Sequence, residues 1–329
     1  MAINENEVDI IIGATKADLT TFMNKWKPIF SCFHLVIVKA PELKEELSIP
    51  EGFNADIYDK SDMEKVAGLS SETLFLGSSC KYFGFLVSKK KYIISIDEDS
   101  IPAKDTKGDT IDPVAQHITN LATPATPFFF NTLYDPYRNG ADFVRGYPFS
   151  MRSGVPCALS CGLWSNTEAA YPRYVDAVLT IPSKVMSPMS GHNFAFDKVL
   201  GAAMIPSFKL KLDGVKWETM EDLWRGMCAK AVADHLGVGV KSGLPYVCLK
   251  GKGEAEDALK DDPEGVKLME EVIPFFEGLK LPVTAVDAED CVEEIAKAAL
   301  QRLVKSHAAF GGAAEAMMDW AALWRRYAS

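Results

Sequence analysis

The chain of 329 residues is poor in cysteine, and its seven cysteines are scattered and odd in number. Such a set does not form a disulfide framework, and Cys157 and Cys161 have no second pair that would complete a zinc site. We therefore expect reduced thiols and a cytoplasmic protein.

Long apolar runs and a targeting segment are lacking as well. No apolar stretch approaches the roughly 20 residues that span a bilayer. The first seven residues are polar and acidic, unlike a signal or transit peptide. We expect no transmembrane segment.

An excess of positive charge is also absent. The chain has 35 Lys and Arg against 45 Asp and Glu, which gives a net charge of −10. An acidic protein repels phosphate backbones, which argues against a nucleic-acid partner. A phosphorylated ligand would need local positive charge from a metal or from a few basic side chains. The 48% hydrophobic content is typical of a globular chain with a full core.

Apolar runs alternate with amphipathic segments in the first hundred residues, which predicts an α/β fold with a mostly parallel, helix-covered sheet. Residues 124–206 are rich in Pro, Gly and aromatics and predict loops and short strands. Trp320 and Trp324, at helical spacing, indicate either a core face or an oligomer interface. The predicted strands are Val8–Ala14, His34–Lys39 and Tyr92–Ile96, and the predicted helices are 18–27, one opened by a capping box at 61–64, 80–89, 221–236, 291–305 and 313–327.

The sharpest local motif is Asp97-Glu98-Asp99, directly after a predicted buried strand. In open α/β sheets, ligands bind at the carboxyl ends of strands. Carboxylates there can hold Mg²⁺ or Mn²⁺ together with phosphate oxygens. The alternative is an acidic turn without a ligand.

A second motif is the loop-like segment 131–154, which carries Arg138, Arg145 and Arg152 among glycines, prolines and aromatics. Arginine suits recognition of phosphate or hydroxyl groups by paired hydrogen bonds. The alternative is surface arginines that pair with Asp135 and Asp142.

A third motif is Glu221-Asp222 at the start of a predicted helix. These carboxylates can bind sugar hydroxyls or transfer protons, or they can simply complement the helix dipole. His235, near the end of that helix, favours a C-terminal cap, whereas His117 and His192 have no predicted partner.

Segments 81–105, 126–156, 173–197 and 221–247 together resemble the reversibly glycosylated polypeptides, and the second, TPFFFNTLYDPYRNGADFVRGYPFSMRSGVP, does so almost without interruption. The similarity runs from about residue 8 to residue 276. The resemblance implies a GT-A-like, Rossmann-type nucleotide-sugar domain over residues 1–285. Residues 286–329 would form a C-terminal helical extension packed on that domain or on a partner.

The resemblance also implies an activity. Members of the family interconvert UDP-arabinopyranose and UDP-arabinofuranose, which supplies arabinofuranose for cell walls or glycoproteins. It implies Mn²⁺ or Mg²⁺ as the metal, a UDP-sugar as substrate and homo- or hetero-oligomers with family members. It further implies a location in the cytosol or on the cytosolic face of the Golgi.

Site residues follow from the matched motifs. The family's DFVRGYPF motif places the reversibly glycosylated arginine at Arg145, and FSMRSG places a second important arginine at Arg152. Because guanidinium is a poor nucleophile, a carboxylate must activate or orient it, and Asp99, Glu221 and Asp222 are candidates. Asp97 and Asp99 are the expected metal ligands. The residues expected to face the nucleotide are Thr15, Lys16, Lys81, Asp97, Glu98 and Asp99.

Several of these positions depart from the family pattern. Asp-Glu-Asp replaces three aspartates, Gly-Ala-Thr-Lys (13–16) replaces Pro-Thr-x-Arg, and Lys81 replaces an arginine. Two alternatives to an active mutase therefore stay open. One is a non-catalytic or weakly active subunit that partners an active relative. The other is a glycosyltransferase that passes the sugar to an external acceptor.

Overall fold

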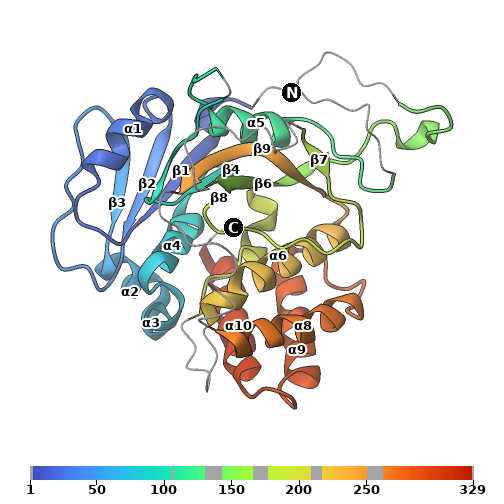
Figure 1. Cartoon of the computed structure of the whole chain (residues 1–329). Helices are drawn as coiled ribbons and strands as arrows, with labels where there is room; N and C mark the ends of the chain where they lie inside the picture. The colour runs from blue at the N-terminus through green and yellow to red at the C-terminus, as the bar shows by residue number, and fades with distance from the viewer. Residues whose placement is uncertain are drawn as a thin grey trace.

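The computed structural model describes residues 3–105, 107–129, 143–165, 177–208, 217–249 and 262–327 (Figure 1). The strands are β1 (Val8–Ala14), β2 (His34–Lys39), β3 (Asn54–Tyr58), β4 (Tyr92–Ile96), β5 (Ser100–Pro102), β6 (Cys157–Ser165), β7 (Leu179–Thr180), β8 (Asn193–Asp197) and β9 (Gly239–Leu249). The helices are α1 (Thr20–Phe30), α2 (Lys60–Ala67), α3 (Ser71–Leu74), α4 (Cys80–Val87), α5 (Pro113–Ala122), α6 (Trp217–Leu236), α8 (Pro263–Glu277), α9 (Ala288–Arg302) and α10 (Ala309–Tyr327).

Within these described residues, nine strands form one sheet in the order β3-β2-β1-β4-β8-β6-β9-β5, with β7 beside β9. Strands β3, β2, β1 and β4 are parallel, and β6 and β9 run in the same direction. Strands β8, β5 and β7 run against them. The predicted α/β class, with a mostly parallel sheet and C-terminal helices, is confirmed.

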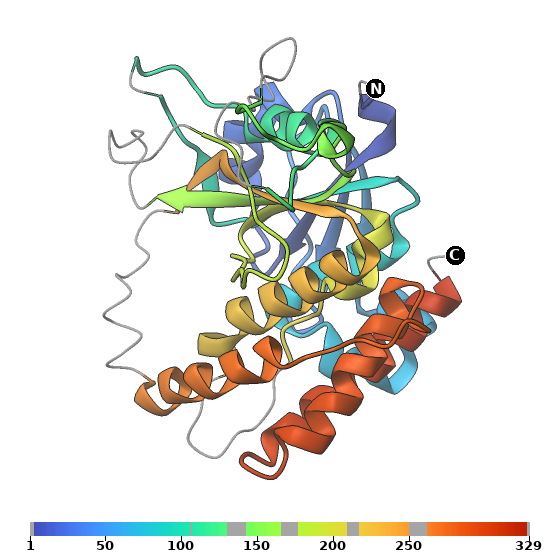
Figure 2. The same ribbon diagram turned by 90° about the vertical axis from the view of Figure 1, so that its right-hand side faces the viewer.

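The sheet separates two apolar cores because alternate side chains of a strand point to opposite faces. Ile10 and Ile12 of β1 pack with α1 and α5 on one face, whereas Ile11 packs with α4 and the helices of the other. Every residue of β1 is buried, as expected for a central parallel strand. Figure 2 shows α5 on one side of the sheet and α6 and the C-terminal helices on the other.

Helix α4 approaches β1 very closely. A Cβ on Gly84 would lie 2.5 Å from Cγ2 of Ile11 and 3.1 Å from Cγ2 of Val38. Only glycine permits this distance, and the close contact sets the first turn of α4 directly beside the end of β1.

The C-terminal helices join the core on the α4 side. Trp320 and Trp324 of α10 are almost wholly buried, and Nε1 of Trp320 donates to the carbonyl of Ala202, 3.0 Å away. That carbonyl lies in the short 3-10 helix η5 (Lys198–Ala203), which contacts both α9 and α10. The tryptophan pair is therefore part of the core. The division into residues 1–285 and 286–329 stays a prediction.

Some sequence expectations need correction. The capping box of α2 is formed by Asp59 and Asp62, so the helix begins at Lys60 rather than after Ser61. Asp59 accepts from the backbone of Ser61, and an aspartate fills this position as well as a serine does. Strands β3, β5 and β9 and helices α3, α5 and α8 were not predicted. Among the described residues, no helix combines the length and the hydropathy needed to cross a bilayer.

Candidate nucleotide-sugar site

A polar pocket of about 380 Å³ opens at the edge of the sheet where β1 and β4 end. It gathers six segments that are far apart in the sequence. Its lining is Gly13, Thr15, Lys16, Ser78, Ser79, Lys81, Tyr82, Asp97, Glu98, Asp99, Gly191, His192, Ser207, Glu221, Asp222 and Arg225.

The strand order explains why these segments meet. Strands β1 and β4 are parallel neighbours, so the residues that follow them, Thr15 and Asp97, emerge at one edge. Strand β8 is antiparallel to β4, and Asn193 at its start pairs with Ile96 at the end of β4. His192 therefore stands beside the acidic motif, and its carbonyl accepts the backbone N–H of Asp97 at 3.1 Å.

Lys81, in the first turn of α4, forms the tightest ion pair of this pocket. Its Nζ lies 2.5 Å from Oδ1 of Asp97 and 2.7 Å from the carbonyl of Gly191, and only 5% of the side chain is exposed. Burial alone would raise the pKa of Asp97. The charge of Lys81 and the contact with His192 outweigh burial and hold that pKa well below its ordinary value. Asp97 is thus an anion at physiological pH.

Asp97, Asp99 and His192 form a cluster that could hold a metal ion, with one donor atom from each within 4.8 Å of the others. Nδ1 of His192 lies 2.9 Å from Oδ2 of Asp97 and 3.7 Å from Oδ1 of Asp99. Ligands at about 2.1 Å from an octahedral cation lie about 3 Å apart at adjacent corners. The His192 and Asp97 donors already have the spacing of two adjacent positions around a small divalent cation, whereas Oδ1 of Asp99 would have to move closer to occupy a third.

Glu98 faces away from this cluster and bridges to the end of β1. One of its oxygens accepts the backbone N–H of Thr15 at 3.1 Å, and the other accepts the Thr15 hydroxyl. Burial raises the pKa of Glu98, although the contacts with Thr15 and Lys16 oppose the rise. Glu98 therefore fixes the turn that carries Lys16 and is not one of the grouped metal donors.

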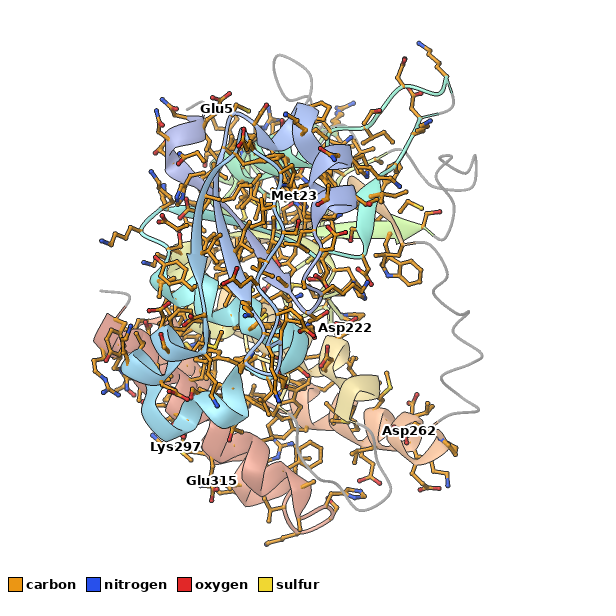
Figure 3. The ribbon with its side chains drawn as sticks, turned by 90° about the vertical axis from the view of Figure 1, so that its left-hand side faces the viewer. Glu5, Met23, Asp222, Asp262, Lys297 and Glu315 are labelled. Atoms are coloured by element: carbon orange, nitrogen blue, oxygen red, sulfur yellow. The ribbon has the colours of Figure 1, made fainter. Side chains whose placement is uncertain are left out.

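Glu221 and Asp222 enter the pocket from α6, and Arg225 one turn later holds both. Figure 3 shows Asp222 on α6, between the sheet and the C-terminal helices. Nη1 of Arg225 lies 3.0 Å from Oδ1 of Asp222, and Nη2 lies 3.5 Å from Oε1 of Glu221. The same Asp222 oxygen accepts the backbone N–H of Gly191 at 3.0 Å. A Cβ on Gly191 would lie 2.6 Å from Nη1 of Arg225, so glycine makes this contact possible.

A buried polar network supports the strand that carries His192. Nδ1 of His117, on α5, lies 2.8 Å from the hydroxyl of Ser160, and Nε2 lies 2.8 Å from Oδ1 of Asn193. Because Asn120 donates to the same hydroxyl and Asn193 donates to the Leu163 carbonyl, the imidazole is neutral with its proton on Nε2. Burial lowers the pKa of His117 to about 4.

The charge of the pocket is negative. Five carboxylates line it, against two lysines and one arginine. A divalent cation would cancel the excess of two negative charges. An anionic ligand could then bind without net electrostatic repulsion.

The structure does not place the predicted arginines in this pocket. Arg145 is exposed, and the guanidinium of Arg152 lies over the rings of Phe143 and Phe149, with its central carbon 5.4 and 5.2 Å from their centroids. Both lie in segment 143–156, which Figure 1 shows projecting beyond β7. Arg138 and its two proposed aspartate partners lie outside the described residues. The roles of Arg145 and Arg152 stay predictions.

Sequence reasoning missed half of the pocket lining, including three residues with side chains of chemical interest: Tyr82, His192 and Arg225. His192 could have been found, because it directly precedes the apolar run NFAF, which reads as a strand. Arg225 follows Glu221 and Asp222 at i+4 and i+3, the spacing of helical ion pairs. For Tyr82 the sequence gives no signal beyond its place next to Lys81. His235 bonds through Nε2 to the carbonyl of Ala285 rather than capping its own helix.

Comparison with known proteins identifies the family. The profile described as "Reversibly glycosylated polypeptide" matches residues 3–329. The chain belongs to the reversibly glycosylated polypeptide family. This family member is 59% identical to "Probable UDP-arabinopyranose mutase 5" of Arabidopsis thaliana, over 98% of this chain and 97% of that protein.

Two further relatives bear on activity. "Probable inactive UDP-arabinopyranose mutase 2" of Oryza sativa is 51% identical, over 99% of this family member and 98% of that protein. "UDP-arabinopyranose mutase 1" of Arabidopsis thaliana is 42% identical, over 97% of this family member and 92% of that protein.

Solved structures show a weaker likeness. Glucosyl-3-phosphoglycerate synthase from Mycobacterium tuberculosis, in complex with Mn²⁺, uridine diphosphate and phosphoglyceric acid, aligns at 11% identity and a TM-score of 0.39, over 83% of this chain and 79% of that one. TarS of S. aureus in complex with UDP-GlcNAc aligns at 11% identity and a TM-score of 0.40, over 98% of this chain and 91% of that one.

Proposed function

We propose that this family member binds a UDP-pentose in the pocket described above and interconverts UDP-arabinopyranose and UDP-arabinofuranose. One observation carries the proposal: the residues predicted to face the nucleotide and the two predicted α6 carboxylates line the same pocket. The 59% and 42% identities to the Arabidopsis proteins named as mutases support it.

The basic and acidic groups have distinct proposed roles. Lys16 and Lys81 provide positive charge for the diphosphate, and Glu98 holds the turn that carries Lys16. Asp97, Asp99 and His192 would hold Mn²⁺ or Mg²⁺, which when bound would neutralise charge on the leaving diphosphate.

The proposed reaction uses Arg145 as a temporary sugar acceptor. The bond between the anomeric carbon and the β-phosphate oxygen breaks, and a bond to a guanidinium nitrogen forms. That nitrogen loses its proton to a carboxylate, for which Asp99, Glu221 and Asp222 are candidates. The sugar ring opens and closes through a different hydroxyl. The β-phosphate oxygen of UDP then re-forms its bond to the anomeric carbon of the furanose as the carbon–nitrogen bond breaks, and the carboxylate returns the proton to the guanidinium nitrogen. Because Arg145 does not line the pocket, segment 143–156 must rearrange to reach the sugar.

The test is product analysis with matched variants. The purified chain is incubated with UDP-arabinopyranose and Mn²⁺, and UDP-arabinofuranose is sought by chromatography. We expect product from the wild type and its loss in Asp97→Ala and Arg145→Ala. The control variants Asp56→Ala and Arg326→Ala remove the same charges away from the pocket and should retain activity. Activity of Arg145→Ala equal to that of the wild type would exclude the arginine-linked route.

A second candidate is a non-catalytic subunit that partners an active relative. Two observations favour it: both oxygens of Asp97 already face Lys81 or His192, and Arg145 lies away from the pocket. A ligand at 100 times its dissociation constant stabilises a protein by about 2.7 kcal/mol. A scaffold subunit should show no such stabilisation by UDP with Mn²⁺, whereas a mutase should.

A glycosyltransferase would be recognised by the product analysis, because it would consume the UDP-sugar and leave UDP.

A further inference from the structure

The hydroxyl of Tyr82 is a buried polar group that lacks a hydrogen-bond partner among the described residues. Tyr82 lines the candidate pocket, yet only 1% of the residue is exposed. Buried hydroxyls almost always have a partner, and an exception at a pocket points to a ligand that supplies one. Burial raises the pKa of Tyr82, so the phenol stays protonated and can donate.

The ring of Tyr82 is held in place on several sides. Its centroid lies 4.9 Å from that of Phe85 and 6.2 Å from that of Trp320, both in edge-on contact. The guanidinium carbon of Arg225 lies 5.4 Å from the same centroid. The ring of Tyr82 is therefore held by packing on these sides.

The groups around Tyr82 are unsuited to phosphate. Arg225 is almost fully buried, and its fork is engaged by Asp222, by Glu221 and, through Nε, by the Ile205 carbonyl at 3.2 Å. Two carboxylates against one guanidinium leave a negative charge, which repels a phosphate. Carboxylates and a phenol are instead the usual partners of sugar hydroxyls, which both donate and accept. Lys16 and the metal cluster belong to other segments of the pocket, and Lys81, although next to Tyr82 in α4, is engaged by Asp97, so a diphosphate is favoured on that side.

We infer that Tyr82, Glu221 and Asp222 form the subsite for the hydroxyls of the pentose, and that Arg225 is a positioning residue that orients the two carboxylates. This inference rests on the proposed function, because it assumes that a UDP-pentose is the ligand. The inference gives the bound substrate an orientation, in which the diphosphate lies toward Lys81 and Asp97 and the sugar lies toward α6.

Tyr82→Phe tests the assignment, because it removes one oxygen and nothing that the oxygen contacts. Binding of UDP and of UDP-arabinopyranose, each with Mn²⁺, is measured by calorimetry for the wild type and the variant. We expect UDP-arabinopyranose to bind about tenfold more weakly to the variant, the loss of one good hydrogen bond, with UDP binding unchanged. The unliganded variant should be at least as stable as the wild type. Tyr92→Phe, at the opposite end of β4, is the matched control and should alter neither affinity.

The possible failures are distinguishable. Wild type that binds neither ligand would overturn the proposed function and this inference together. Wild type that binds both, with Tyr82→Phe equal to it for both, would overturn the sugar subsite alone. An equal loss for UDP and UDP-arabinopyranose would place Tyr82 on the nucleotide side and also overturn the assignment.

Discussion

His117 should make the stability of this protein depend on pH in a way that one substitution can remove. The imidazole is fully buried, and its neutral form is held by Ser160 on one nitrogen and Asn193 on the other. Protonation would put a second N–H against a hydroxyl whose proton already points at the ring. Its pKa is accordingly lowered from 6.5 to about 4.

The direction of this pH dependence follows from the number of protons that the folded and the unfolded chain bind. Between these two pKa values the unfolded chain binds a proton at this residue and the folded chain does not. The free energy of unfolding therefore falls as the pH falls from about 6.5 toward 4. Each pKa unit corresponds to about 1.4 kcal/mol, so His117 contributes about 3 kcal/mol in full and loses about 2 kcal/mol between pH 7 and pH 5.

Urea unfolding at several pH values, followed by tryptophan fluorescence, measures this loss. His117→Gln keeps one donor and one acceptor but cannot be charged, so its unfolding free energy should fall by about 2 kcal/mol less than that of the wild type between pH 7 and pH 5. His307→Gln, at an exposed histidine, is the control and should lack this effect. If the unfolding free energies of His117→Gln and the wild type changed with pH by the same amount, the assignment of His117 as a buried neutral imidazole would be refuted.

Three further predictions concern the site and its support. Lys81→Met leaves Asp97 without its ammonium partner and should cost about 3–5 kcal/mol of unfolding free energy in urea titrations, whereas Lys81→Arg, which keeps the charge, should cost much less. His192→Ala should weaken Mn²⁺ binding by at least about tenfold in a spectroscopic titration, because even outer-shell partners contribute that much; unchanged affinity would remove His192 from the metal cluster. Gly84→Ala should destabilise by about 1–3 kcal/mol through the close contact with β1, whereas Gly311→Ala, which meets only Val304 at 3.9 Å, should be neutral or stabilising by up to about 1 kcal/mol in the same assay.

The strands that bear the acidic motif and the basic turn could be predicted because their signals are local. Buried parallel strands are short, apolar and rich in β-branched residues, and Val8–Ala14 and Tyr92–Ile96 have the predicted bounds. The position of Asp97 at a ligand-binding edge followed from the strand before it. Strand β3 has exposed and half-buried residues and lies at the sheet edge, so it carries no apolar run that could reveal it.

The contacts that the acidic motif makes with its partners could not be predicted, because they depend on which distant segments the fold brings together. His192 reaches Asp97 only because β8 inserts antiparallel next to β4. Tyr82 acquires its importance from burial and from the lack of a hydrogen-bond partner in the described part of the chain, and neither can be read from a single sequence. The Lys81–Asp97 pair joins residues 16 positions apart through the close packing of α4 on β1.

The burial of α10 has a consequence for how the chain is made. Trp320 packs edge-on against Phe75 and Tyr82, residues that are synthesised some 240 positions earlier. Chains emerge from the ribosome N-terminus first, so the sheet and α4 can assemble while residues 309–327 are still missing. Until those residues arrive, the aromatic surface beside the pocket stays open to water and to other chains. The last helix therefore completes the apolar packing around Tyr82. A nascent chain should need protection by chaperones until α10 has been translated.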